Sequence, residues 1–97
     1  MALTVSMLLA ACGGTGGKIA NFDTTSVYDG TGANANRVAS LTTYTHVTVE
    51  CKVQDSYRID YDSTADGGSG GSGYIFRTTD ILTDSGAELN PADVPDC

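Results

Sequence analysis

The sequence predicts a small all-β domain of about five strands, and three observations support this fold class. Short apolar or alternating segments at residues 46–53, 56–62 and 74–77 are typical of β-strands. Turn-forming residues separate such segments, above all at residues 29–36 and 65–73. No stretch has the apolar repeat of an amphipathic helix of useful length. With 97 residues, the chain has room for one domain with one modest core.

Two neighbouring segments carry the clearest strand patterns. Residues 46–53 alternate strictly, with the apolar positions all on one side: Val47, Val49, Cys51 and Val53. The polar positions, which include the single histidine His46, then lie on the opposite side, toward solvent. Residues 56–62 alternate again and place Tyr57 toward the core, where we also expect Tyr74.

The connections are rich in glycine, serine and proline. Residues 65–73 are a run of mostly glycine and serine, which predicts a flexible hairpin loop before the next strand. Residues 78–82 are expected to form a helical turn that is capped by Thr79 or Asp80. Residues 83–97 contain two prolines and little apolar surface, so they predict an irregular tail unless a covalent link ties them down.

The net charge of -7 excludes some classes of partner. The five basic residues are scattered along the chain: Lys18, Arg37, Lys52, Arg58 and Arg77. This scatter forms no basic patch for nucleic acid. The acidic balance also argues against docking of the protein surface on anionic lipid headgroups. Acidity here indicates solubility and self-repulsion rather than a partner.

No motif predicts an enzyme, a cofactor or a metal site. His46 is the only histidine, and no nucleophilic cysteine accompanies it, so a catalytic triad cannot be assembled. Asp60, Asp62 and Asp66 do not keep the spacing of an EF-hand calcium loop. No two cysteines have the Cys-x-x-Cys spacing that zinc and redox motifs use. We therefore expect a protein that binds or assembles, with no catalytic residue, cofactor or metal.

The motif Leu9-Ala10-Ala11-Cys12 resembles the lipobox of bacterial lipoproteins. The resemblance implies that residues 1–11 are a signal peptide that is removed, and that Cys12 carries a diacylglycerol anchor. Residues 12–17 would then contain the lipid-modified cysteine and a flexible glycine-rich linker that holds the domain away from the membrane. The apolar run at residues 2–11 would rise only about 15 Å as a helix, half of a hydrocarbon core of roughly 30 Å, and therefore predicts no transmembrane span.

The segment before Cys12 lacks the basic residues of a secretory signal. Either the natural start lies upstream of Met1, or the motif match is accidental and residues 3–8 are a buried first strand. The lipobox interpretation places the protein in the bacterial cell envelope. The anchor would then be in the outer membrane, with the domain facing the periplasm, or at the cell surface.

The cysteine count of three is odd, which leaves one thiol to explain in an exported protein. If lipid occupies Cys12, Cys51 and Cys97 remain as one pair, and an exported compartment permits a disulfide between them. This bridge would tie down the last residue of the tail. The alternative is two unpaired thiols, with Cys51 a small core residue of its strand.

Residues 27–82 resemble the bacterial SH3 domain (SH3b, SH3 type 3) in the order of their short motifs. These motifs are Val27-Tyr28 with Gly30, Val38 and Leu41, Val47-Thr48-Val49, Tyr57-Arg58-Ile59, Gly73-Tyr74-Ile75, and Ile81-Leu82. The positions at which the family has tryptophan carry tyrosine here or lack an aromatic residue. The resemblance implies a small SH3-like barrel of about five strands at residues 18–82, followed by the tail at residues 83–97.

The same resemblance implies a binding module. Tyrosine combines a large apolar face with a polar tip, which suits a groove for peptide or glycan. Tyr28 and Tyr44 flank loops and are the expected ligand contacts at the surface. We expect a lipid-anchored module that contacts peptidoglycan, through its peptide or its glycan, or an envelope protein. The alternative is a structural or assembly lipoprotein with no wall ligand of its own.

Overall fold

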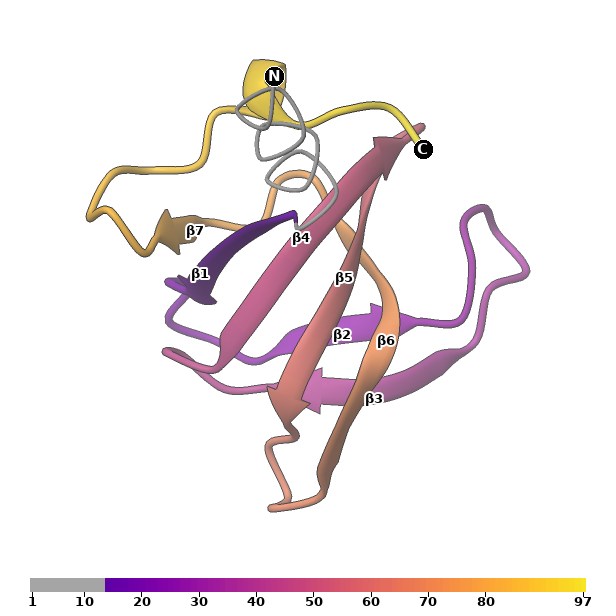
Figure 1. Cartoon of the computed structure of the whole chain (residues 1–97). Helices are drawn as coiled ribbons and strands as arrows, with labels where there is room; N and C mark the ends of the chain where they lie inside the picture. The colour runs from indigo at the N-terminus through magenta and orange to yellow at the C-terminus, as the bar shows by residue number, and fades with distance from the viewer. Residues whose placement is uncertain (1–13) are drawn as a thin grey trace, which may run out of the picture.

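The computed structural model describes residues 14–97, which form seven β-strands and one short 3-10 helix (Figure 1). The elements are β1 (Thr15–Ile19), β2 (Thr25–Tyr28), β3 (Arg37–Leu41), β4 (His46–Val53), β5 (Ser56–Ser63), β6 (Ser69–Phe76), β7 (Ile81–Thr83) and η1 (Pro91–Asp93). The strands form one antiparallel sheet in the order β3-β2-β6-β5-β4-β1-β7. The all-β prediction is confirmed, but the sheet has seven strands rather than about five.

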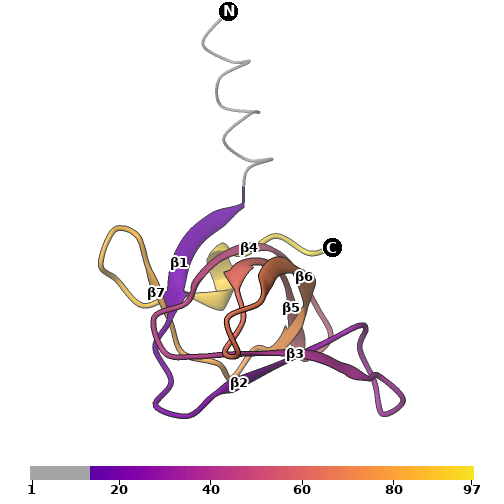
Figure 2. The ribbon, with the colours of Figure 1, turned by 90° about the horizontal axis from the view of Figure 1, so that it is seen from below.

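The sheet curves around its core, as the view from below shows (Figure 2). A flat sheet of seven strands would be about 29 Å wide, at about 4.8 Å between neighbouring strands. Every strand nevertheless contributes to one buried cluster: Ile19, Val27, Leu41, Val47, Val49, Tyr57, Ile59, Ile75, Ile81 and Val94. Curvature is what brings these side chains together. The two edge strands, β3 and β7, do not pair with each other, so the sheet stays open.

The glycine-rich segment that was expected to be a linker lies partly in a strand. Residues 15–17 belong to β1, which lies between β4 and β7. Gly17 is buried, and a Cβ there would lie 2.7 Å from the Leu82 carbonyl oxygen. The expectation of a flexible linker is therefore wrong from Thr15 onward. Glycine is needed here because the neighbouring backbone comes too close for a side chain.

The predicted flexible loop at residues 65–73 is also mostly strand. β6 begins at Ser69 and pairs with β5 along its whole length, so the connection shortens to residues 64–68. Gly73 is buried where β2 reaches β6, and a Cβ there would lie 2.5 Å from Val27 Cγ1. The glycine allows the two strands to approach each other at this point.

The alternation predicted for residues 46–53 holds only in the first half of β4. Val47 and Val49 are buried, whereas Cys51 is partly exposed. The reason is a register shift between Val49 and Cys51, after which Lys52 rather than Cys51 lies opposite Tyr57. Such a bulge turns the following side chains to the other face of the sheet.

The helical turn predicted at residues 78–82 is wrong. Ile81 is buried and begins β7, which pairs with Ile19 and its neighbours in β1. A hydrogen-bonded turn precedes it, in which the Thr79 N–H donates to the Phe76 carbonyl at 3.0 Å. Pairing with β1 and burial of Ile81 outweigh the local capping signal.

The C-terminal segment is held against the sheet. The predicted disulfide is present: Cys51 and Cys97 are joined with a Cα–Cα distance of 4.9 Å. The prediction of an otherwise irregular tail needs correction, because Val94 is 2% exposed and belongs to the core. η1 is capped by the Asn90 side chain, which accepts from the Ala92 N–H at 3.0 Å.

The signal peptide predicted at residues 1–11 and the lipid-modified Cys12 lie outside the described residues. Within residues 14–97, no helix has the length and the apolar character needed to cross a bilayer.

Candidate functional site

The two tyrosines predicted as ligand contacts lie at separate places. Tyr28 ends β2, is half-buried, and lines a hollow of about 210 Å³ together with Phe76. Tyr44 lies in the turn between β3 and β4 and lines another hollow, of about 250 Å³, beside Lys18 and His46. Neither of these two hollows contains both rings. The structure therefore does not bring the two tyrosines together in one groove.

Tyr28 belongs to a group of aromatic side chains on the outer face of the sheet. Its ring centroid lies 5.5 Å from that of Phe76, with the rings tilted by 57°. Tyr28 also pairs with Tyr74 across the β2–β6 ladder. We call Tyr28, Tyr74 and Phe76 the aromatic face. Phe76 is 54% exposed, so part of its apolar ring is available to a ligand.

Phe76 was not among the expected ligand contacts, although the strand pattern around it indicates an outward-facing side chain. Ile75 is fully buried, so the alternation of a strand places Tyr74 and Phe76 on the opposite, outer face. Tyr74 was expected in the core beside Tyr57. Tyr57 is 2% exposed and fulfils that expectation, whereas Tyr74 is only half-buried.

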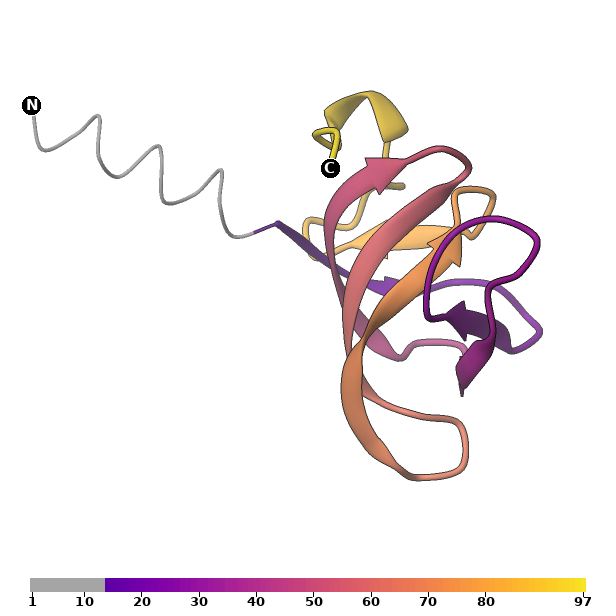
Figure 3. The same ribbon diagram turned by 90° about the vertical axis from the view of Figure 1, so that its right-hand side faces the viewer.

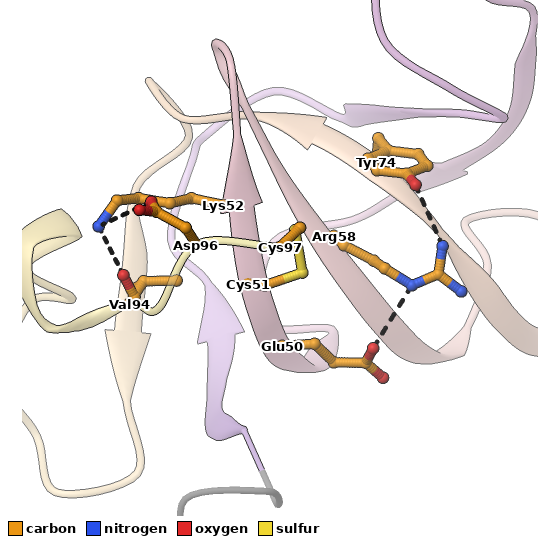
Figure 4. The surroundings of a disulfide bond; sticks show 8 residues. All are labelled: Glu50, Cys51, Lys52, Arg58, Tyr74, Val94, Asp96 and Cys97. Atoms are coloured by element: carbon orange, nitrogen blue, oxygen red, sulfur yellow. Dashed lines mark hydrogen bonds and ion pairs between the residues drawn. A yellow bond between two sulfur atoms is a disulfide. The ribbon is translucent and has the colours of Figure 1, made fainter.

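Arg58 orients Tyr74 (Figure 4). Its Nη1 donates a hydrogen bond to the Tyr74 hydroxyl at 3.2 Å, and its guanidinium carbon lies 5.6 Å from the ring centroid. On its other side, Arg58 Nε lies 3.4 Å from Glu50 Oε1. Arg58 thus links β6 to β4 across β5 and leaves little of its charge free for a ligand.

The surface beside Arg58 is acidic. The pKa of Glu50 is raised, first because its carboxyl group is hydrogen-bonded to Asp60, and then because it is partly buried and near the Asp60 charge. Arg58 opposes this shift. The aromatic face is therefore bordered by carboxylates on the side of β4 and β5.

Two hollows meet at Phe76. The hollow of about 210 Å³ extends toward β2 and is lined by hydroxyl and amide groups from Asn21, Thr24, Thr25, Ser26, Thr78 and Thr79. The other hollow, of about 530 Å³, is lined by Asp55, Arg77, Thr78 and Pro91. The apolar Phe76 ring can stack on one part of a ligand while the hydroxyl and amide groups of the smaller hollow hydrogen-bond to the rest.

Tyr44 has an unusual backbone conformation. Its φ of 71° lies in the left-handed region, which costs a residue other than glycine about 1–2 kcal/mol. The side chain is 70% exposed, so packing in the core does not offset this cost. Lys18 Nζ lies 5.2 Å from the ring centroid, and the Tyr44 N–H donates to the Ile19 carbonyl at 2.6 Å. These contacts fix the turn against β1.

His46 lies on the outer side of β4, as its position in the alternation predicts. Its Nδ1 is 3.2 Å from Asp62 Oδ2, and its Nε2 is 3.6 Å from Asp84 Oδ1. A side chain at Gly16 would collide with Asp84, so this glycine leaves room for the contact across β1. Within the described part of the chain, no three histidine, cysteine or acidic side chains form a group that could hold a metal ion.

Comparison with known proteins yields no relative: no protein-family model, no curated protein and no solved structure matches this chain.

Proposed function

We propose that this protein is a lipid-anchored binding module of the bacterial cell envelope. Its folded part would be a small SH3-like barrel of the SH3b type, and its aromatic face would contact the peptide or the glycan of the cell wall. The single observation that carries this proposal is the Tyr28–Phe76 contact, in which the exposed Phe76 ring lies where two hollows meet. The lipid on Cys12 would hold the module at the membrane.

The strand arrangement supports the SH3-like interpretation. The six motifs that resemble the SH3b family lie on six strands, β2 to β7, in the same order. The strands β7, β1, β4, β5 and β6 are consecutive neighbours in a curved antiparallel sheet, and the β2–β3 hairpin lies beside β6. A five-stranded barrel with one long hairpin between its first two strands would have this order.

A sedimentation assay on purified peptidoglycan tests the ligand. We expect the wild type to be retained, and we expect Tyr28→Ala and Phe76→Ala each to weaken retention about tenfold or more, as loss of an aromatic contact at a binding centre does. Phe22→Ala is the matched control, because Phe22 is 101% exposed and lies outside the aromatic face. Tyr44→Ala should bind like the wild type, since Tyr44 lies at a different hollow.

Two results of that assay would overturn the proposal. Equal retention of the Tyr28→Ala, Phe76→Ala and Phe22→Ala variants would show that the aromatic face is not the contact. Absence of retention of the wild type, together with co-purification of an envelope protein, would instead favour a structural or assembly lipoprotein.

The anchor has a separate test. Expression of the full chain in a bacterial host, with an upstream signal sequence supplied, is expected to yield protein in the membrane fraction with the added mass of the lipid on Cys12. Cys12→Ser should move the protein to the soluble fraction and remove that mass, because the thiol is the site of diacylglycerol addition. Cys97→Ser is the control, because it also removes one cysteine but leaves Cys12 in place. It should leave the protein in the membrane fraction. An unchanged distribution of Cys12→Ser would exclude the lipid anchor.

A further inference from the structure

The two edges of the sheet differ in how they are covered. The outer side of β7 is paired with the residues that follow it: Thr83 N–H donates to the Ala87 carbonyl at 2.8 Å, and Leu89 N–H donates to the Ile81 carbonyl at 2.9 Å. On the outer side of β3, one backbone hydrogen bond is found among the described residues, from the Ala65 N–H to the Ser40 carbonyl at 2.7 Å. The chain therefore covers one edge with its own backbone and leaves the other mostly open.

A groove lies along this open edge. It has a volume of about 500 Å³ and is lined by β3 and by the tip of the β5–β6 hairpin. This hairpin extends beyond the other strands (Figure 3). Its lining residues are Arg37, Val38, Ala39, Ser40, Thr64, Ala65, Asp66 and Gly68. Val38 is 52% exposed.

Backbone polarity makes this groove suited to an extended segment. In an antiparallel strand the N–H and C=O of one residue point to the same side. Because the Ser40 carbonyl is directed toward Ala65 and away from β2, the Ser40 N–H is directed into the groove as well. An added strand would satisfy this donor and cover Val38.

The charges at the groove specify the segment further. All five basic residues lie within residues 14–97. Four of their side chains make an ion pair, a hydrogen bond or an aromatic contact there, and the side chain of Arg37 makes none with the described residues. The groove also contains Asp66 on the hairpin, whose pKa is lowered because the Thr64 hydroxyl and the Gly68 N–H hydrogen-bond to its carboxylate. A ligand would therefore meet a free cation on β3 and a firmly ionised carboxylate across from it.

We propose that the open edge of β3 binds an extended segment of a partner protein, which adds a strand to the sheet and places a carboxylate at Arg37. A second copy of this chain fits less well. The strand β3 contains no acidic residue to meet the Arg37 of a neighbour, and each copy carries a net charge of -7. This inference does not require the lipid anchor or a ligand at the aromatic face.

Peptide binding to the folded protein tests this surface. The probe is a short capped peptide of alternating threonine and valine with one glutamate, compared with versions in which glutamine or lysine replaces the glutamate. We expect the glutamate peptide to bind tightest and to protect the Ser40 amide from hydrogen exchange. Arg37→Gln should weaken that peptide about threefold, as expected for one exposed ion pair, and should abolish the preference for glutamate.

Ser40→Pro removes the donor that points into the groove and spares the carbonyl that accepts from Ala65. We expect it to weaken binding at least about fivefold, the value of one hydrogen bond. Lys18→Gln is the control, because it removes a positive charge from β1, away from the groove, and it should bind the peptide like the wild type. An unfolding curve that matches that of the wild type would show that Ser40→Pro still folds. Arg37→Gln changes an exposed side chain and therefore tests the surface even if Ser40→Pro does not fold.

Three outcomes would overturn the inference. Equal affinity of the glutamate, glutamine and lysine peptides would remove the charge preference at Arg37. Absence of peptide binding, with aggregation that increases in Arg37→Gln, would show that Arg37 only protects the edge from pairing. Reversible dimerisation of the wild type that is lost in Ser40→Pro would assign the edge to a second copy.

Discussion

Reduction of the Cys51–Cys97 disulfide is expected to lower the free energy of unfolding by about 4 kcal/mol. The two cysteines are 46 positions apart, and the chain-entropy model gives about this value for a closed loop of that length. The loss is large for this protein because typical stabilities of single domains are only about 5–15 kcal/mol. Urea unfolding with and without reductant measures it.

The disulfide does more than restrict the unfolded chain, because it also holds the C-terminal segment in contact with β4. Lys52 Nζ donates to the Val94 carbonyl at 2.5 Å (Figure 4). It also donates to the Pro91 carbonyl at 2.9 Å. The Lys52 backbone also accepts from the Cys97 N–H at 2.9 Å. Without the disulfide, these bonds and the burial of Val94 must hold the tail alone.

The double variant Cys51→Ala/Cys97→Ala is the control for this prediction. It should show the stability of the reduced wild type and should not respond to reductant. A loss of less than about 1 kcal/mol would contradict the prediction, since that is the value of a single hydrogen bond. It would mean that Lys52 and Val94 hold the tail with little help from the bridge.

Gly73→Ala is expected to lower the free energy of unfolding by about 1–3 kcal/mol, the usual cost of an extra methyl group in a full interior. The added Cβ would lie 2.5 Å from Val27 Cγ1 and 2.7 Å from the Tyr28 carbonyl oxygen. The second contact is with backbone, so β2 itself would have to move away from β6. Thermal or urea unfolding measures the loss.

Gly30→Ala is the matched control, because a Cβ at Gly30 meets no atom within 4 Å and the residue does not have a positive φ. It should leave stability unchanged or raise it slightly, since alanine restricts the unfolded chain. Equal stability of the two variants would contradict the structure. It would show that residues 69–73 behave as the loose loop that their composition indicates.

Local pattern was sufficient for the strands whose side chains alternate. Residues 56–62 lie in β5 as expected, with Tyr57 and Ile59 in the core, because a polar and an apolar face along one strand need no knowledge of its neighbours. The count of cysteines likewise pointed to the Cys51–Cys97 pair once Cys12 was set apart.

The glycine-rich strands could not be predicted in this way. Glycine has no side chain with which to mark a face, and its composition is that of a loop. Gly17 and Gly73 are strand residues because Leu82 and Val27 approach their backbone from other strands. That requirement exists only after distant segments have come together.

Tertiary structure likewise decided which side chains form a surface. Tyr28 and Tyr44 were both expected as ligand contacts because they flank loops, and the curvature of the sheet places them at different hollows. It joins Tyr28 to Phe76 from a strand 48 residues later, because β2 pairs with β6 rather than with its neighbour in sequence, β1. The sequence by itself determined an all-β chain, since this follows from alternation, and its cysteine number left Cys51–Cys97 as one of two alternatives. Strand order, and with it the aromatic face and the open edge of β3, depends on contacts between distant residues.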